Sequence, residues 1–195
     1  MVGPAKEALL PEADLRPRPA VMLAGAAVVA IVSFASLAAP AALASTVLGI
    51  LMIAGADVDA RTFLLPDTVT GGTLVSGLLA AAALDPFDPG ASAGEAAVRA
   101  VGTAAALLLV RWGYARLRQR EGVGLGDVKL AAGIGAWLPL DAVPVCFGFA
   151  ASAALVAVFL AHLRGRPLHT ATKLPFGAFL CPALWMVFYA SVWGG

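Results

Sequence analysis

The chain has 195 residues, of which 61% are hydrophobic and 13% charged, and its mean hydropathy is +0.89. An average soluble domain is about 25% charged, so this composition indicates an integral membrane protein. The formal net charge of +1 excludes the strongly basic surface that nucleic acid requires, and no nucleic-acid partner is expected. Two cysteines, Cys146 and Cys181, lie in apolar stretches, so neither a paired-cysteine zinc site nor a disulfide framework is expected.

Apolar runs divide the chain into helices. A helix rises about 1.5 Å per residue and needs about 20 residues to cross a bilayer core. Residues 1–19 are interpreted as a cytosolic N-terminal tail, because no clean signal-peptide cleavage site follows them. The next residues form seven apolar segments, at 20–38, 42–57, 68–84, 96–115, 127–139, 142–162 and 175–193. The predicted fold class is an all-α polytopic membrane protein of about seven transmembrane helices.

The breaks between segments set the topology. They are Pro40, the polar stretch 57–67, the turn 85–90, the basic stretch 116–121, Asp141, and residues 164–173. The fifth segment reaches only about 20 Å, less than a bilayer core. We therefore expect its helix to begin at Asp127, sunk beneath a water-filled cytosolic pocket.

The Lys and Arg residues orient the chain, because cytosolic loops are enriched in both. With the N-terminus inside and the C-terminus outside, only Arg99 of the 13 lies outside. The others are Lys6, Arg16, Arg18, Arg61, Arg111, Arg116, Arg118, Arg120, Lys129, Arg164, Arg166 and Lys173. The external connections instead carry Asp85, Asp88, Glu95 and Asp141. This topology brings the stretch 57–67 and Asp127 to the same cytosolic edge.

Asp127 is a charged residue at the edge of an apolar helix. It follows the glycines at 122, 124 and 126 and precedes an apolar helix, where a charged group is costly and is by default functional. Gly124 and Gly126 would let an extended backbone approach closely. The alternative is that Asp127 only caps a helix N-terminus, and the residues alone favour neither interpretation.

Two carboxylates that share one proton can hydrolyse a peptide bond. The ionised group accepts a proton from water, and the protonated group hydrogen-bonds the scissile carbonyl. Sharing works because two like charges a few ångströms apart cannot both ionise. The acidic stretch 57–67 supplies the candidate partners for Asp127, and such a pair needs no cofactor or metal.

Three stretches resemble one family. Glu121-Gly-Val-Gly-Leu-Gly-Asp-Val-Lys129 resembles the second catalytic motif of the type IV prepilin leader peptidases, membrane aspartic proteases with a Gly-x-Gly-Asp-x-Lys signature. Asp59-Ala-Arg-Thr-Phe-Leu-Leu-Pro-Asp67 resembles the first motif, with an aspartate seven residues before the proline. Pro175-Phe-Gly177 resembles the Pro-Phe-Gly-Pro segment, with Ala178 in place of its second proline. Presenilin-type proteases share the Gly-x-Gly-Asp core, but the two proline motifs favour the prepilin peptidases.

The resemblance implies a function and its residues. Asp59 and Asp127 would be the catalytic pair, and the substrates would be prepilins or pseudopilins, which lose a short basic leader at the cytosolic face of a bacterial inner membrane. Residues 42–195 would form a six-helix protease domain, with 20–38 as an additional helix. The supporting motif residues would be Gly124, Gly126, Lys129, Pro66, Asp67, Pro175, Phe176 and Gly177. No Cys-x-x-Cys insert is present, so N-methyltransferase activity is not expected.

Other residues have simpler interpretations. Asp67 follows Pro66 and is expected to cap the third helix, and Asp57 is expected to be a solvated loop residue. Lys129 lies about 200° around the helix from Asp127 and is expected to extend to the lipid interface. His162 and His169 are expected to belong to a basic loop that contacts anionic headgroups. Gly133 and Gly135 are expected to permit close helix packing, and five aromatic residues to form interfacial belts. These are Trp112, Tyr114, Trp137, Trp185 and Trp193.

One different function stays open on the residues alone. A small transporter or channel could use Asp59 and Asp127 to relay protons or bind a cation. Transporter sites usually lie near the bilayer midplane, whereas both aspartates are expected near the cytosolic edge.

Overall fold

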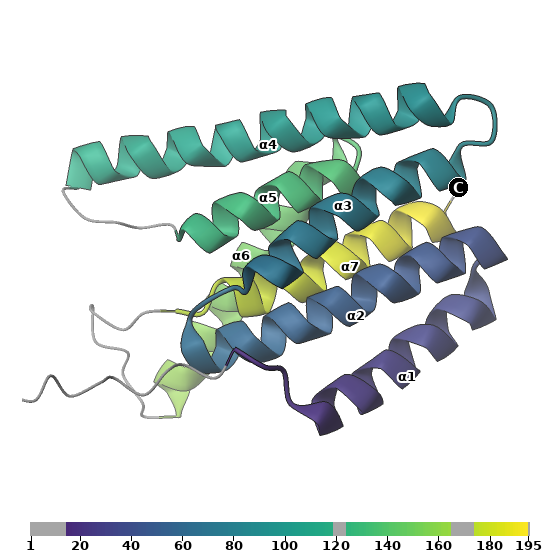
Figure 1. Ribbon diagram of the computed structural model, residues 1–195. Coiled ribbons are helices and arrows are strands. Elements are labelled where there is room, and N and C mark those ends of the chain that lie inside the picture. Colours follow the sequence, from purple (N-terminus) through teal and green to yellow (C-terminus); the bar gives the residue numbers. More distant parts are fainter. Residues whose placement is uncertain (1–14, 119–123, 165–173, 195) are drawn as a thin grey trace, which may run out of the picture.

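The computed structural model describes residues 15–118, 124–164 and 174–194, and the regular structure in these ranges is entirely helical. These ranges contain seven helices, which are labelled in Figure 1. They are α1 (Pro19–Ser36), α2 (Ala39–Thr62), α3 (Asp67–Leu84), α4 (Pro89–Arg118), α5 (Leu125–Trp137), α6 (Ala142–Leu163) and α7 (Gly177–Trp193). Five of them, α1 to α4 and α6, are long and apolar enough to cross a membrane. The predicted fold class is confirmed, and α5, with 13 residues, is as short as the sequence predicts.

Two helices are longer than expected. The prediction that α2 ends at residue 57 was wrong, because α2 continues to Thr62 and carries both Asp57 and Asp59 in its last turns. Two features account for the longer α2. Arg61 lies one turn after Asp57 and pairs with its carboxylate, and Phe63 closes the helix in the left-handed region at φ 56°. The Phe63 N–H donates to the Asp59 carbonyl oxygen at 2.9 Å.

Helix α4 begins at Pro89 instead of residue 96, so Glu95 and Arg99 lie inside it, not in an external loop. They form an ion pair one turn apart. The predicted turn that precedes α4 is confirmed, and its side chains accept backbone hydrogen bonds. Asp85 Oδ1 accepts the N–H groups of Phe87 and Asp88. The Ser92 hydroxyl donates to the same carboxylate and holds the pKa of Asp85 below its usual value.

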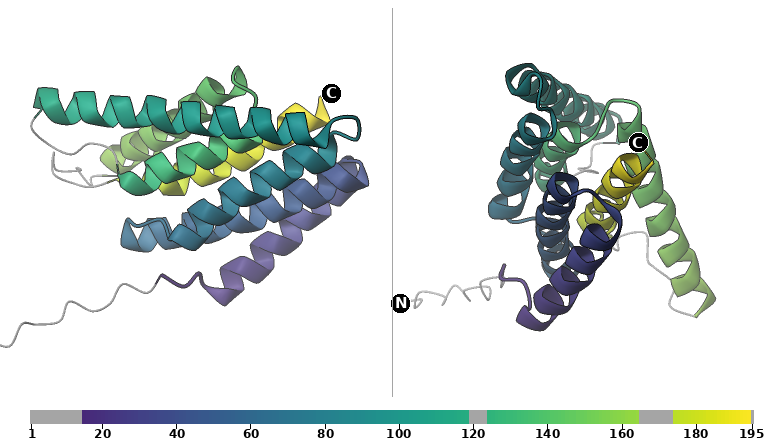
Figure 2. Two further views of the ribbon diagram at one scale, coloured as in Figure 1. Left: turned by 45° about the horizontal axis from the view of Figure 1, so that its top comes forward. Right: turned by 90° about the vertical axis from the view of Figure 1, so that its right-hand side faces the viewer.

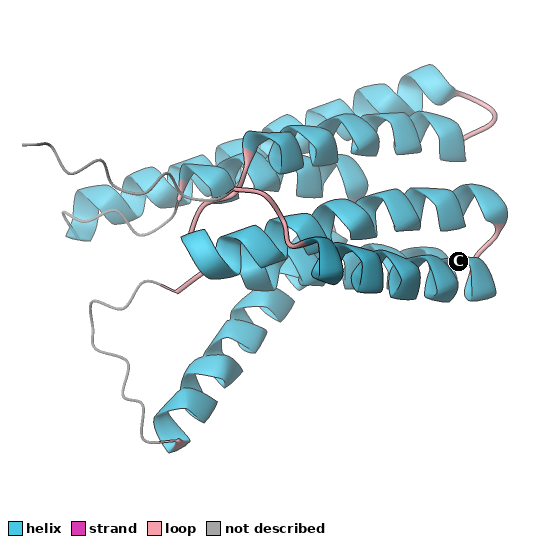
Figure 3. Cartoon of the chain, turned by 60° about the horizontal axis from the view of Figure 1, so that its bottom comes forward, coloured by secondary structure: helices cyan, strands magenta, loops and turns pink. Residues whose placement is uncertain are grey.

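Helices α2, α3, α5 and α7 form the centre of the bundle (Figures 1 and 2). Helix α4 packs across α3 and α5, α1 packs mainly on α2, and α6 packs on α7. Helix α6 leans away from the other helices (Figures 2 and 3). The buried centre consists of aliphatic side chains from three helices, namely Leu48, Met52, Leu130, Ile134, Leu180 and Leu184. Large apolar side chains of α1 and α6, such as Leu23 and Phe159, are exposed in positions suited to lipid.

Small residues bring the central helices together. Lipid is as apolar as leucine, so membrane helices associate through close packing instead of hydrophobic burial. A Cβ at Gly133 would lie 2.7 Å from Thr73 Cγ2, and one at Gly135 would overlap the Arg99 carbonyl oxygen. The close packing expected of these two glycines is confirmed. Trp137, by contrast, is not part of an interfacial belt, since it is buried and its Nε1–H donates to the Thr73 carbonyl oxygen at 2.8 Å.

Gly135→Ala should destabilise the protein by about 1–3 kcal/mol, because the added methyl group would force α5 away from the α4 backbone. Gly148→Ala is the matched control, since a Cβ there meets nothing within 4 Å. Thermal unfolding in detergent measures both variants. Equal melting temperatures for Gly135→Ala and the wild type would contradict the close α4–α5 contact.

Candidate active site

Three helix ends meet at one end of the bundle, the C-terminus of α2 and the N-termini of α5 and α7 (Figure 1). Asp59 lies in the last turn of α2 and is 5% exposed. Asp127 lies in the first turn of α5 and is partly buried. The two carboxylates are close enough to interact electrostatically. The structure therefore brings the two aspartates of the predicted pair together.

The N-terminus of α7 binds Asp59. The Ala178 N–H donates to Asp59 Oδ2 at 2.8 Å, and the Gly177 N–H lies near enough to the same carboxylate to stabilise its charge. Gly177 must lack a side chain, because a Cβ there would lie 2.9 Å from both Cγ and Oδ2 of Asp59. The segment Pro175-Phe176-Gly177 thus starts α7 against Asp59, with Phe176 as the N-cap residue.

Asp127 is held differently from the prediction. Helix α5 begins at Leu125, and its N-cap is Gly124, so Asp127 is neither the first helical residue nor the N-cap. Its carboxylate instead accepts the Gly124 backbone N–H. This bond corresponds to the half of a capping box in which an acidic residue at the third helical position reaches back to the N-cap N–H. This contact holds the Asp127 carboxylate against the glycine turn and stabilises the start of α5.

Leu65 is a site residue that the sequence analysis missed. A Cβ at Gly126 would lie 3.1 Å from Leu65 Cβ, and one at Gly177 would lie 2.9 Å from Leu65 Cδ1. Leu65 thus fills the space between the first turns of α5 and α7. Its position directly before Pro66 in the first motif is the one sequence signal that could have identified it.

Cys181 forms an apolar floor beneath the two aspartates. It is fully buried, and a Cβ at Gly55 would lie 2.9 Å from its sulfur. Its thiol is also within electrostatic reach of both Asp59 and Asp127. Cys181 is thus a packing residue that adjoins the candidate site.

Lys129 and Asp67 form an ion pair at 2.5 Å. One prediction was wrong. Asp67 does not cap α3, whose N-cap is Pro66 with no side-chain cap bond. Its carboxylate instead pairs with Lys129, the residue expected to extend to the lipid interface. The pair joins the first turn of α3 to the first turn of α5, beside the aspartates.

Lys129→Met should change the free energy of unfolding by less than about 1 kcal/mol. Both side chains are more than half exposed, so water screens the pair and its net contribution is small. Chemical denaturation in mild detergent measures the change, with Asp67→Asn as the matched variant. A larger loss in both variants would mean that the ion pair fixes the relative position of α3 and α5.

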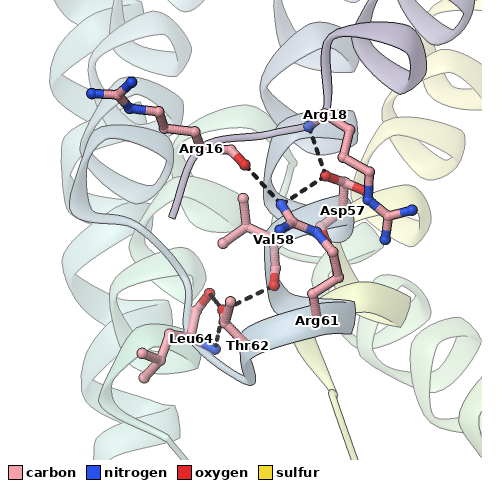
Figure 4. Close-up of polar contacts among 7 residues, drawn as sticks. All are labelled: Arg16, Arg18, Asp57, Val58, Arg61, Thr62 and Leu64. Atoms are coloured by element: carbon pink, nitrogen blue, oxygen red, sulfur yellow. Dashed lines mark hydrogen bonds and ion pairs between the residues drawn. The ribbon is translucent and has the colours of Figure 1, made fainter. Parts of the chain in front are cut away.

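A second polar cluster lies at the same end of α2 (Figure 4). The Asp57 carboxylate pairs with Arg61 at 3.0 Å and with Arg18 at 3.4 Å, and it also accepts the Arg18 backbone N–H. Arg61 in turn donates to the Arg16 carbonyl oxygen. The prediction that Asp57 is a solvated loop residue was wrong, since its side chain is 7% exposed. It binds the segment that precedes α1 to the end of α2.

Asp57→Asn should lower the free energy of unfolding by about 1–2 kcal/mol, because the charge that binds Arg18 and Arg61 is lost. The segment before α1 should also become more sensitive to protease. Limited trypsin digestion of purified protein, compared with Asp88→Asn, measures this. Equal cleavage in the two variants would contradict the role of Asp57 as a clamp.

The remaining candidates lie apart from this cluster. His162 lies in the last turn of α6, and His169 lies outside the described residues. The N-terminal residues 1–14 and Glu121 are also outside them. In the ranges that the structure describes, no three His, Cys, Asp or Glu side chains are grouped so as to hold a metal ion. Trp112 lies near the end of α4 and is stacked beneath the Arg116 guanidinium.

Comparison with known proteins identifies relatives. Residues 46–195 match the type IV leader peptidase family. Leader peptidase HopD of Escherichia coli is 39% identical over 137 residues, which cover 70% of this chain and 86% of HopD. Prepilin leader peptidase/N-methyltransferases from Burkholderia pseudomallei and Dickeya chrysanthemi are 36% and 38% identical over 72% and 74% of this chain. The chain spans about half the length of these two relatives, 44% and 50%.

No solved structure matches the chain significantly. The family match covers most of the sequence, and it includes all three motifs that meet around Asp59 and Asp127. The helices of the structure are those of a multi-pass membrane protein. The chain belongs to the type IV leader peptidase family and is a membrane aspartic peptidase of that family.

Proposed function

We propose that Asp59 and Asp127 are the catalytic pair with which this peptidase removes short basic leaders from type IV prepilin or pseudopilin-like substrates. One observation carries the proposal: carboxylates from two distant motifs interact at the same end of the bundle. A transporter would also use paired acids, but the family match and HopD favour a peptidase.

The chemistry follows from the shared proton. The ionised carboxylate accepts a proton from a water molecule while the water oxygen attacks the scissile carbonyl carbon. The protonated carboxylate donates to the carbonyl oxygen, so the negative charge that develops there is neutralised. Breakdown of the tetrahedral intermediate needs a proton on the leaving nitrogen, which the pair returns. The buried Cys181 and the partly buried Leu65 would limit bulk water around these steps.

We place the pair at the cytosolic face. Apart from Arg99, the described Lys and Arg residues gather toward the same end of the bundle, whereas the opposite end carries Asp85, Asp88 and Asp141. The basic residues at the pair's end include Arg16, Arg18, Arg61, Arg116, Arg118, Lys129 and Arg164. Positive residues are retained in the cytosol, so this distribution supports a cytosolic pair. Helix α4 extends past the starts of α5 and α7, which supports a site sunk below the surface (Figure 1).

A basic leader is expected to be drawn to acidic residues near the pair. The sequence suggests Asp57, Asp59, Asp67 and Glu121 as its acidic partners. Asp57 is already bound to Arg18 and Arg61, and Asp67 to Lys129. The leader would therefore be drawn mainly to Glu121 and to the Asp59–Asp127 pair itself. Residues 42–195 would be the protease domain, with α1 as an additional helix, and the family match from residue 46 supports that division.

The test is cleavage of a purified prepilin in liposomes. The full chain is reconstituted with a prepilin whose leader carries a basic residue before the scissile glycine, and the shortened product is identified by mass spectrometry. Loss of the leader at one bond after that glycine is expected. A substrate that stays intact in the presence of folded enzyme would contradict the proposed substrate class.

A further inference from the structure

The Ala178 peptide N–H is directed at Asp59 and not at the helix to which it belongs. In α7, the first N–H groups that bond within the helix are those of Phe179 and Leu180, both to the Phe176 carbonyl oxygen. The N–H groups of Gly177 and Ala178 make no bond within the helix, and the Ala178 N–H donates to Asp59 Oδ2 at 2.8 Å. The carboxylate thus replaces the solvent that usually satisfies a helix N-terminus.

Such donors distinguish the two protonation states of a carboxyl group. A peptide N–H can only donate, so it stabilises the ionised acceptor more than the protonated one. The positive end of the α7 dipole acts in the same direction. The Gly124 N–H stabilises the charge of Asp127, whereas Asp59 has two such groups at the start of α7: the Ala178 N–H, which donates to it at 2.8 Å, and the nearby Gly177 N–H.

The neighbouring charged groups do not cancel this stronger stabilisation of ionised Asp59. Asp127 faces Asp59 from α5, and the Cys181 thiol faces it from α7. On α2 itself, Asp57 and Arg61 bind each other and the segment before α1. From α3, Asp67 binds Lys129.

We propose that the Ala178 N–H is a positioning donor that holds Asp59 ionised, so that Asp59 is the general base and Asp127 keeps the shared proton as general acid. This assignment rests on the proposed function. The donor lies at the position where the chain departs from the Pro-Phe-Gly-Pro pattern that its third motif resembles. Proline has no N–H, so a chain with proline at 178 would lack this hydrogen bond.

The test is the pH profile of kcat/KM for leader cleavage in two variants. Ala178→Pro removes the N–H, and a proline in the first helical turn is tolerated, the more so because Gly177 has no Cβ to meet the ring. Ala178→Ser keeps the N–H and is the matched control. The acid limb reports the first deprotonation of the pair. It should move up by about one pH unit in Ala178→Pro and stay in place in Ala178→Ser.

Several outcomes would overturn the proposal. They are an unchanged acid limb in Ala178→Pro, a shift in its alkaline limb alone, or the same shift in Ala178→Ser. If Ala178→Pro fails to fold, the peptide bond between residues 177 and 178 is replaced by an ester, which removes only the N–H. The ester enzyme should show the same acid-limb shift, and its absence would also overturn the proposal. These outcomes can be distinguished from a failure of the proposed catalytic pair. If Asp59 and Asp127 were not the catalytic residues, the Asp59→Asn variant would still cleave the prepilin.

Discussion

Replacing either Asp59 or Asp127 with asparagine is expected to slow leader cleavage by about 100- to 10,000-fold. An amide can neither take the proton from the attacking water nor supply one to the scissile carbonyl, so one substitution disables the pair. Asparagine has nearly the same shape as aspartate, so the helices should still form. Co-expression with a prepilin, followed by separation of the processed and unprocessed forms, measures the loss.

Asp57→Asn is the control for this experiment. Asp57 lies on the same helix but is bound to Arg18 and Arg61, so its loss should reduce stability while cleavage continues. Retained processing in Asp59→Asn or Asp127→Asn would exclude the pair as the catalytic residues. Loss of processing in Asp57→Asn, with the protein folded, would mean that the clamp at the end of α2 is also needed for activity.

Gly177→Ala is expected to lower kcat by about 100-fold, with a smaller change in KM. Its Cβ would lie 2.9 Å from Cγ and Oδ2 of Asp59 and from Leu65 Cδ1, so α7 and the carboxylate must move apart. A displacement of about 1 Å in a catalytic group is enough for a loss of this size. Steady-state cleavage of a purified prepilin in detergent measures kcat and KM separately.

Gly148→Ala again serves as the control, since a Cβ there meets nothing within 4 Å. Gly177→Ala should also cost about 1–3 kcal/mol of stability, which thermal unfolding would detect. A folded Gly177→Ala enzyme with wild-type kcat would show that the close contact between α7 and Asp59 is not required for catalysis.

Much of the fold was predictable because a bilayer constrains the sequence strongly. Apolar runs must reach across the hydrocarbon core, so the seven helices could be located from segments such as 20–38 and 142–162. Helix ends were harder to predict. The polar residues of the stretch 57–67 suggested a loop, but the Asp57–Arg61 pair and the left-handed Phe63 extend α2 to Thr62.

The candidate site was predictable only in part. Asp59 and Asp127 were identified by motif register, and the structure brings them together. The partners of Lys129 and Arg18 were not predictable, because each partner lies on a different helix. Lys129 of α5 binds Asp67 of α3, and Arg18, which directly precedes α1, binds Asp57 of α2. Local sequence contains no signal for such pairs.

The sequence by itself determined the class of protein, the number of helices, and the two aspartates that its motifs mark. Composition and segment length are local properties, and they suffice for those conclusions. Only the tertiary structure decided what the third motif does. Gly177 and Ala178 start a helix whose free N–H groups reach Asp59, a residue 119 positions earlier in the chain. Which of two carboxylates holds a proton depends on such donors, and these are set by packing between distant segments.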